Sequence, residues 1–164
     1  MDLVPEVSAR RATGGSDPRQ SWRTPPALVR ELACRYAGGS FLTDPCTDAS
    51  NHLGCGVFHT EEDDGLSHYW HGSVFVNPPY SNIAPWVEKA IDDARCNRID
   101  VIVMLLPSRT DQAWWHDLEQ HAELMVPIRG RVQFLAPPGI KVSSNREPVV
   151  AWVLRRQLTA RDFR

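Results

Sequence analysis

The stretch SVFVNPPY, residues 73–80, joins a continuous apolar run to a polar tetrapeptide with two prolines. An unbroken apolar run of this kind is typical of a strand that is buried on both faces of a parallel sheet. Proline has no N–H to donate to a strand ladder, so Pro78 and Pro79 must end the strand. We therefore expect the tetrapeptide Asn77 to Tyr80 at the carboxyl end of a buried parallel strand.

A helix and a second buried strand follow this stretch. Residues 84–95 have the apolar spacing of a helix, and residues 101–106 form another apolar run that ends at Pro107. A strand, a helix and a strand in this order predict a right-handed parallel crossover. Further along the chain we expect a helix over 111–121, a strand over 124–128, a hairpin over 130–135 and a last strand over 149–154.

The chain before this stretch contains one helix and two short strands. Thr24-Pro25-Pro26 predicts a helix start with Thr24 as a hydroxyl N-cap, and Gly38-Gly39 predicts the end of that helix. Short strands are expected over 40–43, which runs into Asp44-Pro45, and over 56–59, which is followed by an acidic cluster at 61–64. The whole pattern predicts an α/β fold, with a mostly parallel sheet and helices on both faces.

Composition indicates one domain. The 164 residues, 42% of them hydrophobic, suffice for one core, which we place at residues 21–155. Residues 1–20 are expected to be a disordered tail and residues 156–164 a basic tail. No leader or membrane-length apolar run is visible, which predicts a cytoplasmic protein. The four cysteines form no Cys-x-x-Cys pair, so we expect neither a metal site nor disulfides.

Charge is unevenly distributed along the chain. Residues 129–164 carry eight Arg and Lys against two acidic residues, a net charge of +6, which leaves −8 for the preceding residues. Such asymmetry can mark a surface that faces phosphates, or it can be a solvated basic tail. The candidate DNA contacts are Arg109, Arg129, Arg131 and Lys141.

Residues with useful chemistry follow several of the expected strands. Asp44, the acidic cluster, Asn77 and Arg109 each come after a strand, and ligands of open parallel sheets bind at the carboxyl ends of the strands. A shared crevice is therefore expected. Each residue also has a simpler interpretation: Asp44 as an N-cap or Asx turn, the acidic cluster as a solvated loop, and Arg109 as a partner of Asp111.

The tetrapeptide has the acceptors that an amine-methylating enzyme needs. Because the two prolines stiffen the backbone, the Asn77 amide oxygen and the Pro78 carbonyl can be fixed hydrogen-bond acceptors. Two acceptors on the hydrogens of a conjugated amine would localise its lone pair for attack on a sulfonium methyl group. Tyr80 offers an aromatic face to a flipped base. The alternative is a proline-rich turn without chemistry.

Ordered motifs extend over most of the chain, from Trp22 to about Leu154. They are WRTP (22–25), FLTDPC (41–46), EDDGL (62–66), WHG (70–72), VFVNPPYS (74–81), LLPSRTD (105–111) and RGRV (129–132). Through these motifs, taken together and in this order, the chain resembles the phage-type DNA N6-adenine methyltransferases, a family of S-adenosylmethionine-dependent amino methyltransferases.

This resemblance implies a Rossmann-like methyltransferase fold, S-adenosylmethionine as methyl donor, DNA as partner and a bacterial host cytoplasm as location. It implies Asn77, Pro78, Pro79 and Tyr80 as catalytic residues. The implied cofactor-binding residues are Trp22, Thr24, Pro25, Asp44, Pro45, Cys46, and Asp63 or Asp64 for the ribose. The usual glycines after the acidic residue are replaced by residues 47–51, which departs from the wider class.

Rival functions keep the same fold. Cytosine N4 and the side-chain amide of a protein glutamine are also conjugated amines, although Asn77 fits adenine or glutamine better than cytosine. A non-catalytic nucleic-acid-binding module is the rival from another class, but it would predict damage to the tetrapeptide. Asn77 comes only 33 positions after Asp44, which is too short a distance for an inserted recognition domain, so sequence specificity is expected to come from loops, chiefly residues 130–145, or to be weak.

Overall fold

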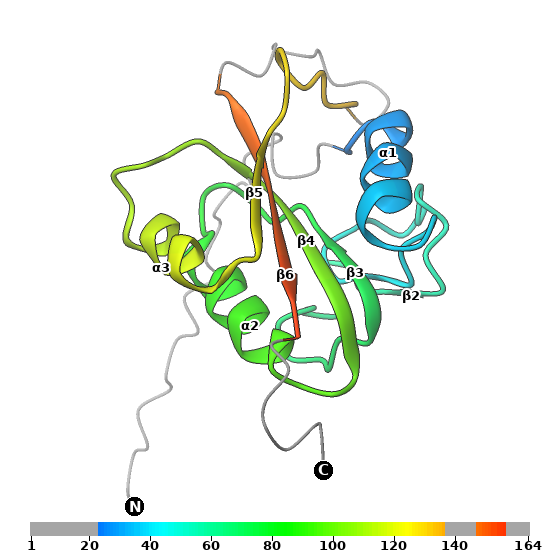
Figure 1. The fold of residues 1–164 in the computed structure, drawn as a ribbon. Helices are drawn as coiled ribbons and strands as arrows, with labels where there is room; N and C mark the ends of the chain where they lie inside the picture. Colours follow the sequence, from blue (N-terminus) through cyan, green and yellow to red (C-terminus); the bar gives the residue numbers. More distant parts are fainter. Residues whose placement is uncertain (1–22, 137–146, 157–164) are drawn as a thin grey trace, which may run out of the picture.

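The computed structural model describes residues 23–136 and 147–156. The expected tails, apart from Arg156, fall outside the described residues, as do Trp22 and Lys141. The strands are β1 (Thr43–Asp44), β2 (Val57–Phe58), β3 (Gly72–Val76), β4 (Ile99–Pro107), β5 (Leu124–Pro127) and β6 (Val149–Arg155). They form one sheet with the order β2-β1-β3-β4-β6-β5 (Figure 1).

The centre of the sheet is built from the two apolar runs. β3 and β4 pair in parallel with Val74 opposite Ile102, and both of these side chains are fully buried. β1 is parallel to both β2 and β3, whereas β6 is antiparallel to both β4 and β5. The chain therefore enters β6 at the edge of the sheet where β4 ends.

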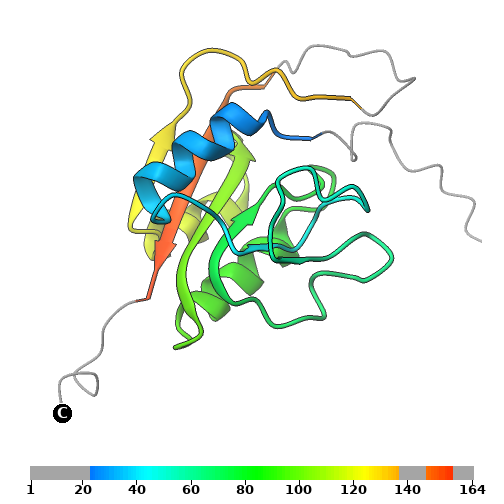
Figure 2. The same ribbon diagram turned by 90° about the vertical axis from the view of Figure 1, so that its right-hand side faces the viewer.

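Helices cover both faces of the sheet, as expected. α1 (Pro26–Tyr36) packs on one face, against the side of the sheet that contains Phe75 and Val103. α2 (Ala84–Ala94) and α3 (Ala113–His121) cover the opposite face, where Trp70 and Trp152 are buried. Figure 2 shows α1 lying across its face of the sheet. Alternating side chains of β3 and β4 thus supply two separate hydrophobic cores.

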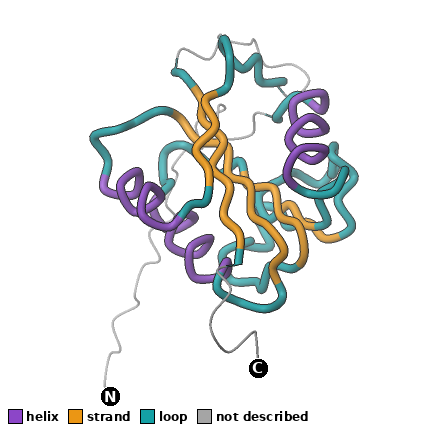
Figure 3. The backbone as a smooth tube through the Cα atoms, in the orientation of Figure 1, coloured by secondary structure: helices purple, strands orange, loops and turns teal. Residues whose placement is uncertain are grey.

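Loops take the place of helices in the connections on either side of β2. Residues 45–56 and 59–71 contain no helix, and Figure 3 shows how much of this region is loop. The chain runs outward from β1 to β2 and then returns past β1 to β3, so the strand order reverses between β1 and β3. Such a reversal leaves a crevice at the carboxyl ends of the two strands.

Two local expectations were wrong. No hairpin forms over 130–135; instead Leu135 makes an isolated antiparallel bridge with Arg23, joined by two backbone hydrogen bonds of 2.9 and 2.8 Å. The N-cap of α1 is Pro25, without a side-chain cap bond, and Thr24 is buried. Gly38 and Gly39 do end α1, with positive φ angles of 67° and 111°. None of the described helices has the length and apolar character needed to cross a membrane.

Candidate active site

A cavity of about 470 Å³ lies where the strand order reverses. This volume is in the range of small-molecule binding sites. Its lining joins segments far apart in the sequence: the exit of β1, the acidic cluster after β2, the exit of β3, and the start of α1. The shared crevice expected from the sequence is therefore present for Asp44, the acidic cluster and Asn77, whereas Arg109 does not line it.

Asp44 is the last residue of β1 and lines the cavity with Pro45 and Cys46. Its side chain is 3% exposed, and its Oδ1 accepts a hydrogen bond from the Cys46 N–H at 3.2 Å. This bond is the Asx turn considered above. Burial raises the pKa of Asp44 to about 7, against the opposing effect of the hydrogen bonds from Cys46 and Thr47. The side chain thus combines a turn with a buried carboxyl group facing the cavity.

Asn77 follows β3 directly, and both Asn77 and Pro79 line the cavity. The Asn77 backbone N–H forms a hydrogen bond with the Cys46 thiol, so the exits of β1 and β3 are in contact. Burial raises the pKa of that thiol well above its usual value, which keeps the sulfur neutral. Pro78 is buried. Asn77 and Pro79 therefore share one cavity with Asp44, Pro45 and Cys46, the candidate site for the methyl donor.

Tyr80 does not line the cavity; it packs beside it, against both hydrophobic cores. Its hydroxyl donates to the Leu105 carbonyl at 3.2 Å, and its ring meets Phe134 edge to face, with centroids 6.2 Å apart. Burial raises the pKa of the phenol, so the hydroxyl stays protonated. The ring orientation is thus fixed by the core.

The residues of the acidic cluster, 61–64, do not all face the cavity. Glu61, Glu62 and Asp64 line the cavity, whereas Asp63 does not. The exposed Asp63 carboxylate accepts hydrogen bonds from the backbone N–H and the hydroxyl of Thr60, at 2.9 and 2.8 Å. These two bonds lower the pKa of Asp63. Of the two candidates for a ribose contact, the geometry favours Asp64.

Gly65 holds this acidic loop against the exit of β1. A Cβ atom on Gly65 would lie 1.8 Å from the Pro45 carbonyl oxygen, so only glycine permits this approach of the two backbones. The Gly65 carbonyl accepts a hydrogen bond of 2.9 Å from the indole N–H of Trp70. The loop is therefore fixed on both sides of Gly65.

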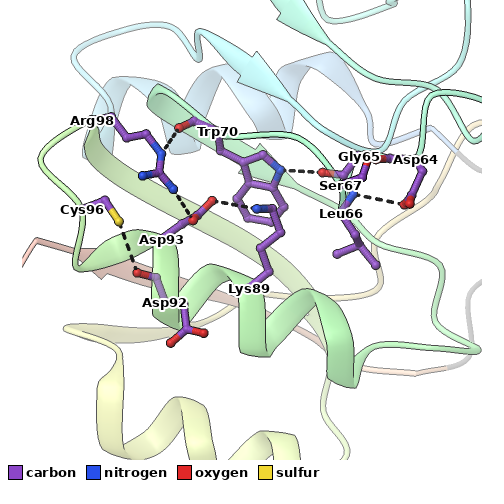
Figure 4. A network of polar contacts seen from close by, with 10 residues as sticks. All are labelled: Asp64, Gly65, Leu66, Ser67, Trp70, Lys89, Asp92, Asp93, Cys96 and Arg98. Carbon is purple, nitrogen blue, oxygen red and sulfur yellow. Dashed lines mark hydrogen bonds and ion pairs between the residues drawn. The ribbon is translucent and has the colours of Figure 1, made fainter.

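Trp70 is itself held by a partly buried polar network (Figure 4). Its carbonyl accepts from the Arg98 Nε at 3.1 Å, and its ring lies 5.0 Å below the Lys89 ammonium group. Both cations pair with the buried Asp93. Because Trp70 also stacks on Trp86, which lines the cavity, this network connects α2 to the acidic loop.

The variant Gly65→Ala tests this close approach. The new methyl group must push the acidic loop away from Pro45, which should lower the free energy of unfolding by about 1 to 3 kcal/mol. Donor affinity should fall as well, because Asp64 moves with the loop. Gly56→Ala is the control, since its Cβ would come closest to the flexible end of Leu42 at 3.2 Å and would lie at an ordinary contact distance of 3.9 Å from the Leu42 carbonyl oxygen. If the two variants unfolded at the same temperature and bound the donor with the same affinity, this function of Gly65 would be contradicted.

Several residues that line the cavity were not singled out from the sequence. Arg23 pairs with Asp48 at 2.6 Å, and His52 Nε2 lies 3.2 Å from the Thr24 carbonyl oxygen. Burial lowers the pKa of His52. Thr24 lines the cavity as expected from the resemblance, whereas Pro25 does not. A polar group in a loop gives no periodic signal, so only the fold brings these residues to the site.

The candidate DNA contacts differ in their surroundings. Arg129 and Arg131 are exposed and follow the carboxyl end of β5. Because β4 and β5 are both antiparallel to β6, their carboxyl ends lie at the same edge of the sheet. Arg109 is half-buried and pairs with Glu147 rather than with Asp111. Arg155 lies at the opposite edge, where it pairs with Glu123 at 3.1 Å and donates to the Tyr36 carbonyl. The described arginines of residues 129–164 therefore lie at both ends of the strands and not at one.

The strand order reverses between β1 and β3, and the cavity at this point is lined by Asp44 at the end of β1 and by Asn77 of the Asn-Pro-Pro-Tyr motif. Together these features define a Rossmann-like methyltransferase. A solved structure assigned as an RNA methyltransferase from Pyrococcus horikoshii shares the fold, with a TM-score of 0.55 and 14% identity over 84% of this chain and 87% of its own.

The family follows from the sequence match. The model of the DNA N-6-adenine-methyltransferase (Dam) family matches residues 12–162, so the chain belongs to this family and is an adenine-specific DNA methyltransferase. A DNA N-6-adenine-methyltransferase of Escherichia phage T1 is 29% identical over 171 residues, which cover 92% of this chain and 70% of the relative. The resemblance inferred from the motifs is confirmed.

The methyltransferase family and fold imply S-adenosylmethionine as methyl donor. The cavity fits this molecule in net charge, because the ammonium and sulfonium groups of S-adenosylmethionine outweigh its one carboxylate. Acidic residues line the cavity on two sides: Asp44 at the exit of β1, and Glu61, Glu62 and Asp64 after β2. Hydroxyl groups of a ribose also have carboxylate acceptors within the same lining.

Proposed function

We propose that the chain methylates the N6 amino group of adenine in this cavity, with Asn77 acting on the amino group. The observation that carries this proposal is that Asn77 and Pro79 line the same cavity as Asp44 and the acidic loop. Donor and acceptor sites are then adjacent. Because one relative comes from a phage of Escherichia, we place the reaction in the cytoplasm of a bacterial host.

The donor site consists of the exit of β1 and the acidic loop. In this proposal Asp44 faces the ammonium end of the donor, with Pro45 and Cys46 forming the wall beside it. Asp64 accepts hydrogen bonds from the ribose hydroxyls, and Thr24 closes the cavity from the start of α1. When bound, S-adenosylmethionine supplies a methyl group on a positively charged sulfur, which is open to attack by a lone pair.

The chain's own acceptors prepare the adenine amino group. The Asn77 side-chain oxygen and the Pro78 carbonyl oxygen each accept a hydrogen bond from one of its two hydrogens. These bonds favour a pyramidal nitrogen, whose lone pair is then no longer delocalised into the ring. As the new N–C bond forms and the bond between the methyl group and the sulfonium sulfur breaks, positive charge develops on nitrogen, and both oxygens stabilise this charge. One of the two N–H protons then leaves to water, which returns the methylated amino group to its neutral form. Tyr80 packs beside the cavity and is only partly buried, and in this proposal the exposed part of its ring contacts the flipped base.

Product analysis tests the proposed reaction. Purified chain is incubated with DNA and S-adenosylmethionine labelled in the methyl group, and the DNA is digested to nucleosides. The label is expected in N6-methyladenine. Label in N4-methylcytosine, or in a protein glutamine amide when protein is the acceptor, would replace this function by one of its rivals. Donor binding without any transfer would favour a non-catalytic binding module.

The positive charges beyond β5 are expected to contact the DNA backbone. The double charge reversal Arg129→Glu and Arg131→Glu should weaken DNA binding and reduce the slope of log affinity against log salt by about 0.9 for each phosphate that is no longer neutralised. Fluorescence anisotropy at several salt concentrations measures both quantities.

Arg35 and Arg95 provide the matched control for this experiment. Both are exposed and lie at the opposite edge of the sheet, at the carboxyl ends of α1 and α2. Reversing these two charges alters the net charge by the same amount, yet it should leave most of the salt slope in place. An equal effect of the two double variants would mean that DNA responds only to overall charge.

A further inference from the structure

Arg109 makes a three-point contact beside the tetrapeptide. Its Nε and Nη2 donate to the two carboxylate oxygens of Glu147, at 2.9 and 3.0 Å. Its Nη1 donates to the Tyr80 carbonyl oxygen at 2.9 Å. All three guanidinium nitrogens are therefore engaged, in the planar fork geometry that lysine cannot reproduce.

The three residues come from three different points of the sheet edge. Tyr80 follows β3, Arg109 follows β4, and Glu147 precedes β6, which enters at the edge where β4 ends. The backbone reinforces the contact, because the Ser108 N–H donates to the Pro148 carbonyl at 2.8 Å. The side chains of Arg109 and Glu147 are 35% and 44% exposed, and an ion pair of such exposure contributes little to overall stability. We therefore expect the Arg109–Glu147 ion pair to act on the local geometry of the turn at Tyr80 rather than on overall stability.

The tetrapeptide has a particular need for an external anchor. Pro78 and Pro79 have no N–H, so neither can donate a backbone hydrogen bond that fixes this turn, although the Pro79 carbonyl accepts one from Asn82, at 3.0 Å. Two bonds of Tyr80 hold its far end: the hydroxyl to Leu105, and the carbonyl to Arg109. A displacement of about 1 Å at a reacting centre can cost a factor of about 100 in rate.

We propose that Arg109, oriented by Glu147, is a positioning residue for the catalytic motif and not a DNA phosphate contact. The inference rests on the proposed function of Asn77 to Tyr80. Arg109 acts through the Tyr80 carbonyl and holds the turn so that the Asn77 oxygen meets the amino group. Glu147 neutralises its charge, and three of its five N–H donors are already bound to Glu147 and to the Tyr80 carbonyl within the protein.

Two charge-specific variants separate positioning from phosphate binding. Arg109→Lys keeps the charge but loses the fork, and Glu147→Gln keeps the shape but loses the charge that orients Arg109. Positioning predicts that both lower the single-turnover rate by about 10- to 100-fold. Donor KM, DNA affinity and salt slope should stay as in the wild type. Asp111→Asn removes one nearby acidic charge without touching Arg109, and should alter none of these quantities.

A phosphate contact predicts the opposite pattern. Arg109→Lys would then keep its rate and its salt slope, and Glu147→Gln would free Arg109 and tighten DNA binding. Either result overturns the positioning proposal. Reduced rates for both variants with unchanged DNA binding support it, and a double variant no slower than the slower single variant shows that the two residues act as one unit.

Amide hydrogen exchange keeps the test independent of activity. The Asn82 N–H donates to the Pro79 carbonyl at 3.0 Å, so exchange at residues 80–82 reports on the order of the turn. Exchange there should be faster in Arg109→Lys and Glu147→Gln than in Asp111→Asn; equal exchange would contradict the proposed anchor even if the wild type transferred no methyl group. If the wild type methylates adenine and both variants are as active as the wild type, the positioning function of Arg109 is rejected, whereas the proposed reaction stands.

Discussion

Asn77→Ala is expected to reduce the single-turnover rate of methyl transfer by about 100- to 1,000-fold or more, because it removes an acceptor used mainly in the transition state. Both ligands should still bind, since the cavity keeps its walls and its acidic residues. The rate is measured with labelled donor and excess enzyme, and the two affinities by separate titrations. Circular dichroism verifies that the variant is folded.

Three further variants sharpen this test. Asn77→Asp should keep part of the activity, because a carboxylate also offers an acceptor oxygen. Tyr80→Ala should lower DNA affinity along with the rate, since stacking on a base contributes about 1 to 3 kcal/mol. Asn82→Ala removes the same amide group from an exposed position in the same turn and should remain active. A folded Asn77→Ala with near wild-type rate would reduce the tetrapeptide to a structural turn.

Asp44→Asn is expected to stabilise the ligand-free protein while weakening donor binding. The folded pKa of about 7 lies above the ordinary value of 3.8, so the carboxylate form is disfavoured by folding. The wild type therefore loses stability as the pH rises from about 4 through 7, by up to about 4 kcal/mol at the rate of 1.36 kcal/mol per pKa unit. The asparagine variant has no such loss, and should unfold at the higher temperature at pH 8.

Donor binding should have the opposite pH dependence. An ammonium group on the ligand favours ionised Asp44, so wild-type donor affinity should fall as the pH drops below about 7. Asp44→Asn should bind the donor more weakly by about 1 to 3 kcal/mol at pH 8 and lose most of this pH dependence. Calorimetric titration from pH 5.5 to 8.5 measures the affinity.

Asp100→Asn serves as the control for both measurements. Asp100 is an exposed acid at the amino end of β4, away from the cavity, and its loss should change neither quantity by much. If Asp44→Asn matched the wild type in donor affinity at every pH, the role of Asp44 would be confined to its turn.

Local pattern was enough to predict the frame of the sheet. The unbroken apolar runs that form β3 and β4 predict strands buried on both faces of the sheet. Pro78 and Pro79 cannot donate to a strand ladder, so β3 ends before them. The glycine pair after α1 likewise ended the helix where expected. From these elements alone, Asp44 and Asn77 were expected at one edge of a parallel sheet, and they line one cavity.

The pairing of distant residues was decided only by the tertiary structure. Arg109 had Asp111 beside it in the sequence, yet its partner is Glu147, because antiparallel β6 starts where β4 ends. Leu135, expected in a hairpin, pairs instead with Arg23. Periodicity reports which side chains of one segment are buried, but it carries no information about which segments meet. The raised pKa of Asp44 also required the fold, since burial is its main cause.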